Sequence, residues 1–571
     1  MYSAATMETL SNDGPMSILD SGKILPKQLL TLVVCCLAIS VIVIDFTIVI
    51  NALPSIQATF TGVSVKDLEW ITSLYGVVFG SFLLTWGKLG DEFGRKKILM
   101  GGVAIFVLGS VIDGLSGNLS MMLVGRTIQG FGGAMASPST LSILSTTFTG
   151  KARSIAFGLW GAVAGAAGVI GPLMGGYFTT YVTWRWSFLI NVPLGAVTLA
   201  VALYAIRESK FRDSKYSTDF LGVTLITLGL ASLLFGFIEA QTYGWLVPNE
   251  TFTLGSFEWP LSSVSLPAVC FIAGAAFLAG FTLAELRRAK VGKVPLFDFS
   301  LLKYKAFRYG LFTVGIVAVG EFATIFIYSI YFQVGRGLAP INSALNLAPF
   351  AIAMFVFSPI AGKLSNKYGA KRTVTTGMIM EALALFLLFA ITGDSTPFYY
   401  FYPVFVLFGA GFGLSLPQLT NFVLASVPFQ RAGVASAANN TIRQISAAFG
   451  VAVLGAVMVA EISTVGHADL AVANLPIGVK DSLGVLLNSG LSGGISPNLP
   501  SGLSPLALGT IRSVITDSIS QGVKWAAFTA GIFVSFGALS SMLIPVPRPV
   551  IKQETKIGIV ATPLVPRSSR T

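Results

Sequence analysis

Two acidic residues lie inside long apolar stretches, where a charged side chain is costly. Asp45 lies in the apolar run 29–51, and Glu321 lies in the run 309–333. A charge near the centre of a bilayer costs at least about 2.5–3.5 kcal/mol on insertion scales, so we expect both residues to face a shared cavity and to be readily neutralised. Such a pair could bind a cationic substrate and exchange it for protons. The alternative is a carboxylate whose hydrogen bonds only hold the structure together.

A short, charge-dense segment rich in glycine separates two apolar runs and recurs later in the chain. The first copy is 87–97 (GKLGDEFGRKK) and the second is 362–372 (GKLSNKYGAKR). Local turn chemistry alone is not expected to repeat eleven positions this closely, 275 residues apart. We interpret the two segments as the same cytoplasmic hinge in two halves of a duplicated membrane protein.

The residue types of the first hinge suggest a role beyond connecting two helices. Gly87, Gly90 and Gly94 allow tight turns and close approach to neighbouring helices. Asp91 can lie at the N-terminus of a neighbouring helix and pair with Arg95. The alternative is a basic loop that serves only to fix the topology.

The composition is that of a helical membrane protein. Of 571 residues, 54% are hydrophobic and 11% are charged, whereas soluble proteins carry about 25% charged residues. Apolar runs of roughly 20 residues, long enough to cross a bilayer as helix, recur along the chain. Backbone groups in lipid must be satisfied within the segment, and the runs are too long for barrel strands. The predicted fold class is therefore an all-α polytopic membrane protein.

Several other classes are disfavoured by composition. The net charge of +12 is explained by basic cytoplasmic loops, so nucleic acid is not an expected partner. The three cysteines lie in apolar runs and His467 is the one histidine, which suggests neither a disulfide framework nor a metal site. No G-x-x-x-x-G-K-[ST] phosphate loop is present, so ATP drive is not expected. We predict no enzyme activity and no cofactor.

Fourteen apolar runs can be assigned as membrane spans. They are 29–51, 70–88, 98–116, 119–146, 155–178, 187–206, 220–238, 266–285, 309–333, 344–362, 373–392, 399–420, 433–460 and 524–545. With the hinge 87–97 placed inside, about 29 of the Lys and Arg residues fall on the cytoplasmic side and about six on the other. This asymmetry favours cytoplasmic termini.

The internal repeat extends beyond the hinge and divides the chain. Residues 130–132 (GFG) match 411–413 (GFG), Arg153 matches Arg431, and Asp45 matches Glu321. We therefore expect a cytoplasmic N-terminal tail (1–28), an N-terminal six-helix bundle (29–206), two inserted transmembrane helices with linkers (207–308), a C-terminal six-helix bundle (309–545) with an external loop (463–521), and a cytoplasmic C-terminal tail (546–571).

Further polar and small residues within the spans are candidates for function. Small residues in the fifth span permit close helix packing, and its proline should bend the helix; these are Gly161, Gly165, Gly171, Pro172, Gly175 and Gly176. Polar residues of the twelfth and thirteenth spans either line the cavity or form hydrogen bonds between helices; they are Gln418, Asn421, Asn439, Asn440 and Arg443. Glu239 and Glu381 are weaker candidates.

Together these segments resemble the motifs of the major facilitator superfamily, and in particular its fourteen-helix drug:proton antiporter branch. The hinge 87–97 resembles the loop signature of the superfamily. Four further segments resemble motifs of the antiporter branch. They are 45–54 (DFTIVINALP) in the first span, 126–130 (RTIQG) in the fourth, 161–176 in the fifth and 184–195 (WRWSFLINVPLG) at the entry to the sixth. The resemblance covers about residues 29–545.

This resemblance implies a fold of two six-helix bundles plus two inserted helices, working by alternating access. It implies that the hinge residues Gly87, Gly90, Asp91, Gly94, Arg95 and Lys96 form a cytoplasmic latch between the halves. It also implies that Arg126 is a proton-relay or gating residue, with Gln129 in its hydrogen-bond network. The fifth-span motif is associated in this family with export.

We therefore predict a proton-coupled exporter of amphipathic or cationic small molecules in the plasma membrane. The expected partners are the substrate, protons and the lipid bilayer, the protein is expected to be a monomer, and the proton gradient supplies the drive. Two alternatives stay open. One is an exporter of an endogenous lipid, siderophore or metabolite, and the other is a non-transporting membrane receptor on the same fold.

Overall fold

The computed structural model describes residues 25–60, 63, 65–210, 219–254, 257–488 and 504–545. The C-terminal tail predicted at 546–571 lies outside these residues, as do 1–24 of the N-terminal tail and 489–503 of the predicted external loop. The N-terminal tail was predicted to end at residue 28. The first helix begins instead at Pro26, because proline is well suited to a first helical turn, where no backbone N–H is needed.

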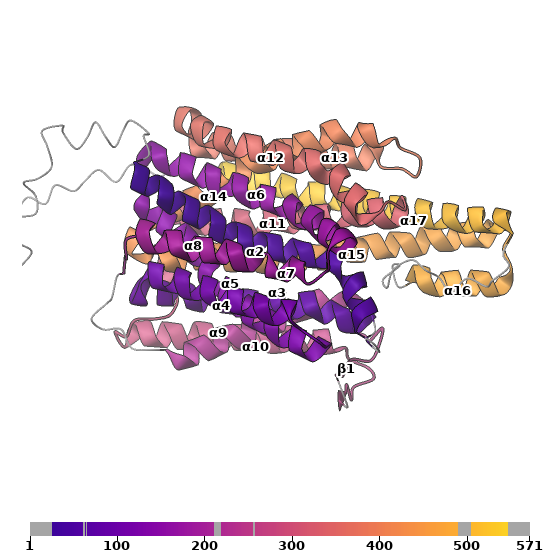
Figure 1. Cartoon of the computed structure of the whole chain (residues 1–571), viewed down its shortest axis with the longest axis horizontal. Helices are drawn as coiled ribbons and strands as arrows, with labels where there is room; N and C mark the ends of the chain where they lie inside the picture. Colours follow the sequence, from indigo (N-terminus) through magenta and orange to yellow (C-terminus); the bar gives the residue numbers. More distant parts are fainter. Residues whose placement is uncertain are drawn as a thin grey trace, which may run out of the picture.

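The described chain is a bundle of long helices that lie nearly parallel (Figure 1). The N-terminal half consists of α2 (Pro26–Thr59), α3 (Val65–Phe93), α4 (Arg95–Gly114), α5 (Leu119–Thr147), α6 (Gly150–Tyr181), the short α7 (Trp186–Leu189) and α8 (Asn191–Ala205). The inserted pair is α9 (Phe220–Tyr243) and α10 (Leu266–Lys290), joined through a small hairpin of β1 (Thr253–Leu254) and β2 (Phe257–Glu258).

The C-terminal half repeats the arrangement. It consists of α11 (Lys305–Ile330) with a terminal π-turn η3 (Tyr331–Gly335), α12 (Pro340–Tyr368), α13 (Ala370–Ile391), α14 (Phe401–Ala425), α15 (Ala432–Val472), α16 (Ile477–Asn488) and α17 (Pro505–Leu543). The connecting 3-10 turns are η2 (Phe299–Lys303), η4 (Phe398–Tyr400) and η5 (Phe429–Arg431).

The predicted all-helical membrane fold is confirmed. Thirteen helices of the described chain are long and apolar enough to cross a membrane. The predicted span 119–146 corresponds to α5, a helix of 29 residues that is not among these thirteen. Most residues of α5 are buried against other helices, so it needs less apolar surface than a helix that faces lipid. All fourteen predicted spans therefore correspond to helices.

The two hinges separate equivalent helices by the same backbone device. Gly94 divides α3 from α4 with φ of 119°, and Gly369 divides α12 from α13 with φ of 90°. Residues with a side chain rarely adopt these values. We call the end of the bundle that contains Gly94 and Gly369 the hinge end, and the opposite end the far end. Both described chain termini lie at the hinge end, since Gln28 bonds to Thr147 and Ile544 lies beside Lys371.

The structure corrects the register of one repeat. Gly130 packs on Tyr75 of α3, and Gly409, not Gly411, packs on the equivalent Phe350 of α12. In the next layer, Gly132 packs on Gly102 of α4 and Gly411 packs on Gly377 of α13. The predicted match of 130–132 with 411–413 is therefore wrong by two residues, and the counterpart of 130–132 is 409–411. Local similarity of two GFG segments outweighed the spatial equivalence of their packing partners.

The hydrophobic core is shared between the halves at one end only. At the hinge end, one cluster of buried residues combines Leu144 and Phe157 of the N-terminal half with Phe307 and Val434 of the C-terminal half. At the far end, each half has its own cluster, one around Ile48 and α7 and the other around α11, α14 and α17. The halves are therefore most firmly joined at the hinge end.

Small residues bring α6 and α12 together across the two halves. A Cβ at Gly158 would lie 3.3 Å from Pro359, and a Cβ at Gly362 would lie 2.7 Å from the carbonyl oxygen of Ser154. Further toward the far end, Gly176 faces Ile341. Contact along this line depends on small side chains, because larger ones would separate the two backbones.

The inserted pair lies at one edge of the bundle (Figure 1) and contacts both halves through α9. Leu234 of α9 packs against Gly80 of α3 in the N-terminal half. Gln241 of α9 donates from Nε2 to the carbonyl of Val451 of α15, at 2.9 Å, in the C-terminal half. The insertion therefore connects the halves along one side.

The predicted external loop 463–521 is largely helical, and this prediction is corrected. α15 continues to Val472, α16 occupies Ile477–Asn488, and α17 already begins at Pro505. These segments extend beyond the other helices at the far end (Figure 1). Their apolar residues, such as Leu470, Leu483 and Ile515, pack into the core of the C-terminal half. The Gly, Ser and Pro content suggested a loop, but this packing stabilises helix.

The contact between α6 and α12 can be tested by cross-linking. A Cβ at Gly176 would lie 3.7 Å from the Cβ of Ile341, which matches the roughly 3.5–4.5 Å between the Cβ atoms of a disulfide. We predict that the double variant Gly176→Cys/Ile341→Cys forms a disulfide on oxidation, measured as loss of maleimide-polymer labelling that a reductant restores.

The matched control places the first cysteine two turns away, at Gly168, which faces Val43 of α2. Gly168→Cys/Ile341→Cys should stay fully labelled after oxidation. Equal cross-linking in both variants, or none in the first, would show that α6 and α12 are packed differently.

Candidate functional site

Asp45 and Arg126 form an ion pair inside the N-terminal half, between α2 and α5. Arg126 Nη1 lies 2.7 Å from Asp45 Oδ2, and both side chains are completely buried. Arg126 Nε also donates to the carbonyl of Ile71 at 2.9 Å, which ties it to α3. A buried ion pair is tolerated only where the remaining polar atoms of both side chains find hydrogen-bond partners. The neighbours of the pair therefore contribute to its stability.

Three further side chains complete this network. Asp45 Oδ1 accepts hydrogen bonds from Gln129 Nε2 at 3.0 Å and from Asn191 Nδ2 at 2.8 Å. Gln129 Oε1 accepts from Arg126 Nη1, and Gln129 Nε2 donates to Ser110 Oγ, both at 2.6 Å. The structure thus brings Asp45, Arg126 and Gln129 together. The sequence analysis missed Ser110 and Asn191, although Asn191 lies within the 184–195 motif.

Helix geometry and aromatic rings position the arginine. Arg126 and Gln129 are three residues apart on α5 and so share one helix face. The guanidinium carbon of Arg126 lies 4.3 Å from the ring centroid of Tyr75 and 5.9 Å from that of Phe188. These cation–π contacts add to the ion pair in a site without water access.

Asp113 of α4 is a further buried acid close to this network, and the sequence analysis missed it. It is fully buried beside Gly125 of α5, and neither of its carboxyl oxygens has a hydrogen-bond donor in the described chain. The signal was available, because Asp113 is an acidic residue within the apolar run 98–116.

Glu321 lies in a different buried cluster in the C-terminal half. It is 2% exposed, and its Oε1 has no hydrogen-bond partner in the described chain. The carboxyl group of Glu381 on α13 is within hydrogen-bonding reach of it, and Arg443 on α15 acts on it electrostatically. Glu381, a weaker candidate from sequence, is fully buried and accepts a hydrogen bond from Ser415 Oγ.

Glu239, the other weaker candidate, is buried elsewhere, at the boundary between α9 and α3. Ser73 of α3 is its hydrogen-bond partner. Its hydrogen-bond partner belongs to neither of the two buried clusters just described.

Both acids lie at the depth where the shared core ends. On α2, Ile42 belongs to the core shared by both halves, whereas Ile44 belongs to the separate N-terminal core. On α11, Val317 belongs to the shared core and Ala323 to the separate C-terminal core. Asp45 and Glu321 therefore occupy equivalent levels in the two halves.

In this structure Asp45 and Glu321 do not face a common chamber, which corrects that expectation. Each acid is buried and bonded to its own half. The neighbouring aromatic residues Phe46 and Phe322 are instead 45% and 38% exposed, because adjacent positions of a helix point to different faces. Any opening that joins the two acids requires a different conformation.

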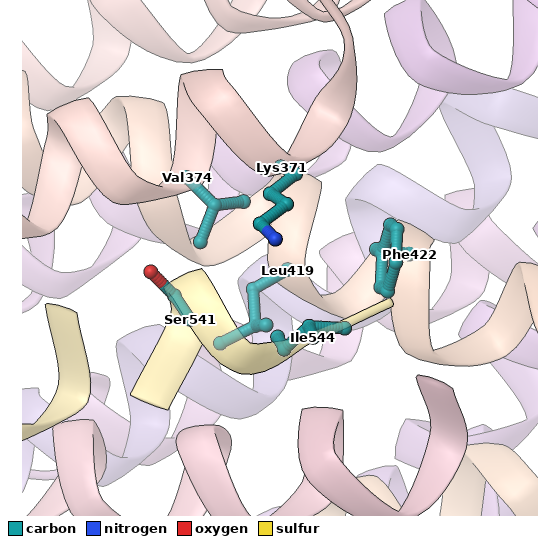
Figure 2. A pocket seen from close by; sticks show the side chains of 6 residues that line it. All are labelled: Lys371, Val374, Leu419, Phe422, Ser541 and Ile544. Atoms are coloured by element: carbon teal, nitrogen blue, oxygen red, sulfur yellow. The ribbon is translucent and has the colours of Figure 1, made fainter. Parts of the chain in front are cut away.

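Two hollows in the described chain lie away from both acids. A cavity of about 10 Å³ at the hinge end holds at most roughly one water molecule; its lining residues are Lys371, Val374, Leu419, Phe422, Ser541 and Ile544 (Figure 2). A hollow of about 470 Å³ in the far-end extension is bordered by His467, Lys480 and Asp481. Neither has the position of a substrate chamber between the halves.

The first hinge forms a contact between the halves through Asp91. Its Oδ1 accepts from the backbone N–H of Gly433 at 2.9 Å, and its Oδ2 accepts from that of Val434 at 3.0 Å. Arg95 Nη2 donates to Asp91 Oδ1 at 2.6 Å and to the carbonyl of Phe429 at 3.0 Å. A carboxylate is favourable at a helix N-terminus, and here the helix is α15 of the other half. The predicted geometry of Asp91 and Arg95 is confirmed.

The remaining hinge residues support this contact. A Cβ at Gly87 would lie 2.6 Å from the carbonyl oxygen of Gly433, so only glycine allows this approach. Gly90 lies beside Ser139 of α5. The backbone N–H of Lys96 donates to Glu208 Oε1 at 3.1 Å, which caps the start of α4. Sequence analysis had not singled out Glu208.

The second hinge copy makes a weaker version of the same contact. Asn366 Nδ2 donates to the carbonyl of Lys151 of α6, at 3.1 Å. Ala370 occupies the place of Arg95, so the ion pair has no counterpart. Charge-assisted hydrogen bonds are the stronger kind, and the first hinge is therefore the stronger of the two contacts.

Two alternatives were open for the polar residues of the twelfth and thirteenth spans, and the structure shows the second, hydrogen bonds between helices, most of which join the two halves. Gln418 Nε2 donates to the carbonyl of Ser154 at 3.1 Å, and Asn421 Oδ1 accepts from Arg153 Nε at 2.9 Å. Further contacts within this group are those of Asn440 with Ser137 across the halves, at 3.2 Å, Arg443 with Thr420, at 3.0 Å, and the buried Asn439 with Asn440, at 3.5 Å. Among these, Arg443 belongs to the Glu321 cluster.

The glycines of the fifth-span motif contact two different neighbours. A Cβ at Gly171 or Gly175 would lie 2.9 Å or 2.7 Å from backbone carbonyls of α2, within the same half. Gly161, Gly165 and Gly176 instead face Pro417, Met354 and Ile341 of the C-terminal half. Asn51 of α2 donates to the carbonyl of Pro172 at 2.7 Å, close to the proline within α6. The motif thus lets α6 pack on both sides.

Known proteins resemble this chain in sequence and in fold. The family model described as Major Facilitator Superfamily matches residues 35–451. The "Tetracenomycin C resistance and export protein" of Streptomyces glaucescens is 30% identical over 88% of this chain and 88% of its own length. The "Methylenomycin A resistance protein" of Bacillus subtilis is 28% identical over 80% of this chain and 92% of its own length.

A third relative and two solved structures agree with these matches. The "Multidrug resistance protein Stp" of Mycobacterium tuberculosis is 29% identical over 76% of this chain and 77% of its own length. The crystal structure of a human organic anion transporter covers 90% of this chain and 100% of its own, with a TM-score of 0.54 and 11% identity. A proton:xylose symporter covers 90% and 96%, with a TM-score of 0.53 and 13% identity. At these identities the structures support the fold alone.

The buried ion pair predicts a non-additive effect on stability. Arg126→Met leaves the Asp45 carboxylate without its counter-charge, and Asp45→Asn leaves the guanidinium group without its own, so each should cost about 3–5 kcal/mol. The double variant should be less destabilised than the sum of the two. Unfolding of the purified protein in detergent measures this. Strictly additive losses would contradict an energetic coupling between the two residues.

The hinge contact predicts a change in how often the hinge end opens. Removing a carboxylate cap costs about 1–2 kcal/mol, so Asp91→Ala should raise maleimide labelling of a cysteine at the buried position Ser137 by roughly five- to thirty-fold. The native cysteines are replaced by alanine for this measurement.

Asn366→Ala, at the equivalent place in the other half, is the matched control. It should raise labelling much less, because it removes a neutral hydrogen bond. Equal effects of the two variants would show that the helix N-terminus of α15 adds nothing to the hinge contact.

Proposed function

The chain belongs to the Major Facilitator Superfamily, and from that premise we propose that it exports drug-like small molecules in exchange for protons. A member of this family is a multi-pass membrane transporter and not an enzyme. Proton exchange and the direction of transport are the parts proposed here. The plasma membrane as its location, with the hinge end in the cytoplasm, belongs to the same proposal.

The observation that carries the proposal is the position of the two buried acids. Asp45 and Glu321 occupy equivalent places in the two halves, at the level where the shared core gives way to two separate cores. A proton-coupled carrier needs ionisable groups whose surroundings change as the halves move. Residues at the boundary of a shared core meet this requirement, because separating the halves alters their exposure.

The distribution of contacts between the halves supports alternating access. At the hinge end, the halves share a core and are joined by Asp91, Gln418 and Asn440. The polar contacts at this end are hydrogen bonds that can break one by one. The close approach of α6 and α12 depends on glycines such as Gly158 and Gly362. In the proposal, the hinge end opens to admit substrate from the cytoplasm while the far end closes.

The class of substrate is inferred from the relatives. Their printed names refer to tetracenomycin C, to methylenomycin A and to multidrug resistance. A chain of similar sequence over most of its length is proposed to export compounds of this kind, small and amphipathic. An ionised Glu321 would additionally favour cations, since a cation can balance the charge left when this acid gives up its proton.

Transport by the purified protein in liposomes tests the proposal. With a pH gradient imposed, the wild-type protein should accumulate ethidium, an amphipathic cation, against its concentration gradient, and a protonophore should abolish this accumulation. Tetracenomycin C serves as a second probe. Asp45→Asn and Glu321→Gln should lose uphill accumulation while keeping downhill exchange, because the carrier still moves but no longer couples to protons.

Glu285→Gln is the matched control, because Glu285 is a buried acid of the inserted helix α10 whose carboxylate accepts from the backbone of Phe297. It should transport as the wild type does. Proton coupling would be refuted if uphill accumulation were unchanged without the pH gradient and in both variants. Binding of both probes without any flux would favour a receptor.

A further inference from the structure

The buried cluster around Glu321 differs from the network around Asp45, because its two acids are within hydrogen-bonding reach of each other. Its members are Glu321 on α11, Glu381 on α13 and Arg443 on α15, and Ser415 of α14 donates to Glu381. Glu321 and Glu381 are 2% and 0% exposed. Four helices of one half thus enclose two carboxyl groups and one guanidinium group.

The charges of this cluster do not balance if both acids are ionised. The Asp45 carboxylate is paired with the Arg126 guanidinium group at 2.7 Å, and the buried Asp113 lies close by with no hydrogen-bond donor in the described chain. The Glu321 cluster would contain two negative charges and one positive charge. An uncompensated charge away from water is costly, and two adjacent carboxylates disfavour each other's ionisation. A single added proton makes the cluster neutral.

The hydrogen bonds of Glu321 and Glu381 also require one more donor than the described side chains supply. Ser415 Oγ donates to Glu381 Oε1. Glu321 Oε1 and Glu381 Oε2 have no donor in the described chain, although the two carboxyl groups are within hydrogen-bonding reach of each other. Two ionised carboxylates can only accept. A proton on one of the two carboxyl groups supplies the missing donor.

The fold itself does not require an acid at position 381. In the C-terminal half, Gly411 of α14 packs against Gly377 and Glu381 of α13. In the N-terminal half, Gly132 of α5 packs against Gly102 and Phe106 of α4. Glu381 therefore occupies the place that Phe106, a buried core residue, has in the other half. The acid is a local addition to one half, not a consequence of the repeated packing.

From this geometry we propose that Glu321 and Glu381 form a proton-binding site that holds one proton between the two carboxyl groups. Uptake of the proton adds one O–H bond and one positive charge to the cluster, and release reverses both, with no other bond changed. Glu381 is then a proton-binding residue in its own right. The role of this site in export rests on the proposed function, whereas the presence of the proton does not.

Within the described chain, Arg443 is the charged side chain of the surrounding helices that acts electrostatically on Glu321 of the pair. α12, α14, α15 and α17 pack against α11 or α13. The other charges on these helices and on α13 lie toward their ends, such as Lys371 at the hinge end and Lys524 near the far end. Titration of the pair is therefore governed by the two acids and by Arg443.

Infrared spectroscopy of the reconstituted full-length protein detects the proton directly. A protonated carboxyl group has a carbonyl-stretch band that shifts in D2O, whereas a carboxylate lacks it. The wild-type minus Glu381→Gln difference at neutral pH should contain one such band, which disappears on alkalinisation. Glu381→Gln keeps the shape of the side chain and supplies an N–H donor to Glu321, so it should fold.

Two further variants complete this measurement. Ser415→Ala keeps both carboxyl groups but removes a hydrogen bond, and it should shift the frequency of the same band. Glu285→Gln, in the inserted pair, should leave that band in place. The proposal would be overturned if the Glu381→Gln spectrum kept the full wild-type band intensity. It would also be overturned if Ser415→Ala left the frequency of the band unchanged.

Transport separates this inference from the proposed function. Loss of the band in Glu381→Gln together with loss of gradient-driven ethidium accumulation supports both. If the wild-type protein shows no gradient-driven transport but Glu381→Gln still loses the band, the proton site stands and the proposed function fails. If gradient-driven transport is normal and the band is unaffected in Glu381→Gln, the proton site is refuted while the proposed function stands.

Discussion

A charge enclosed in an apolar helix bundle must be balanced by groups that touch it, and this constraint organises the protein. The penalty for an isolated buried charge exceeds the free energy that most single contacts can return. Three of the acids described here are balanced in three different ways. Asp45 is paired with Arg126 and two amides, and Asp91 accepts from the first N–H groups of α15. Glu321 is within hydrogen-bonding reach of a second carboxyl group, and Arg443 acts on it electrostatically.

These three arrangements differ in how easily they can be disrupted, and this difference connects the structure to a movement of the halves. The Asp45 network lies within one half and is fully hydrogen-bonded around the carboxylate. The Asp91 contact joins the halves and must break whenever the hinge end opens. In the proposal made above, the Glu321 cluster becomes neutral when it binds one proton. A proton and a movement between halves can thus be connected through the cost of buried charge.

The duplicated halves share their packing but not their chemistry. Glycines at equivalent places bring equivalent helices together, as Gly87 and Gly362 show at the two hinges. The polar residues have diverged on this common frame. Arg126 has no basic counterpart at its equivalent position, Asp91 is replaced by Asn366, and Glu381 replaces a core phenylalanine. The inserted helix α9 contacts both halves on one side, so the assembly is also asymmetric in its surroundings.

The sequence by itself determined the properties that depend on local chemistry. Apolar runs long enough to cross a bilayer identified the helices, and the two hinges revealed the duplication. Isolated acids within apolar runs located the buried Asp45 and Glu321, although Asp113 was missed. The sequence also misassigned 463–521 as a loop, because its glycines and prolines are local signals whereas the packing of Leu483 and Ile515 is not.

Only the tertiary structure decided which buried groups meet. Asp45 contacts Arg126 and Asn191 from 81 and 146 residues away, and no periodicity in the sequence encodes such distances. The acid Glu381 was visible as a residue type, but its neighbour Glu321 is on another helix. The same holds for Gln418 and Asn440. The sequence left open whether they line a cavity or bond between helices, and the structure places both in hydrogen bonds that join the halves. A buried polar side chain needs a hydrogen-bonding or charged partner, and the packing of the helices determines which residue becomes that partner.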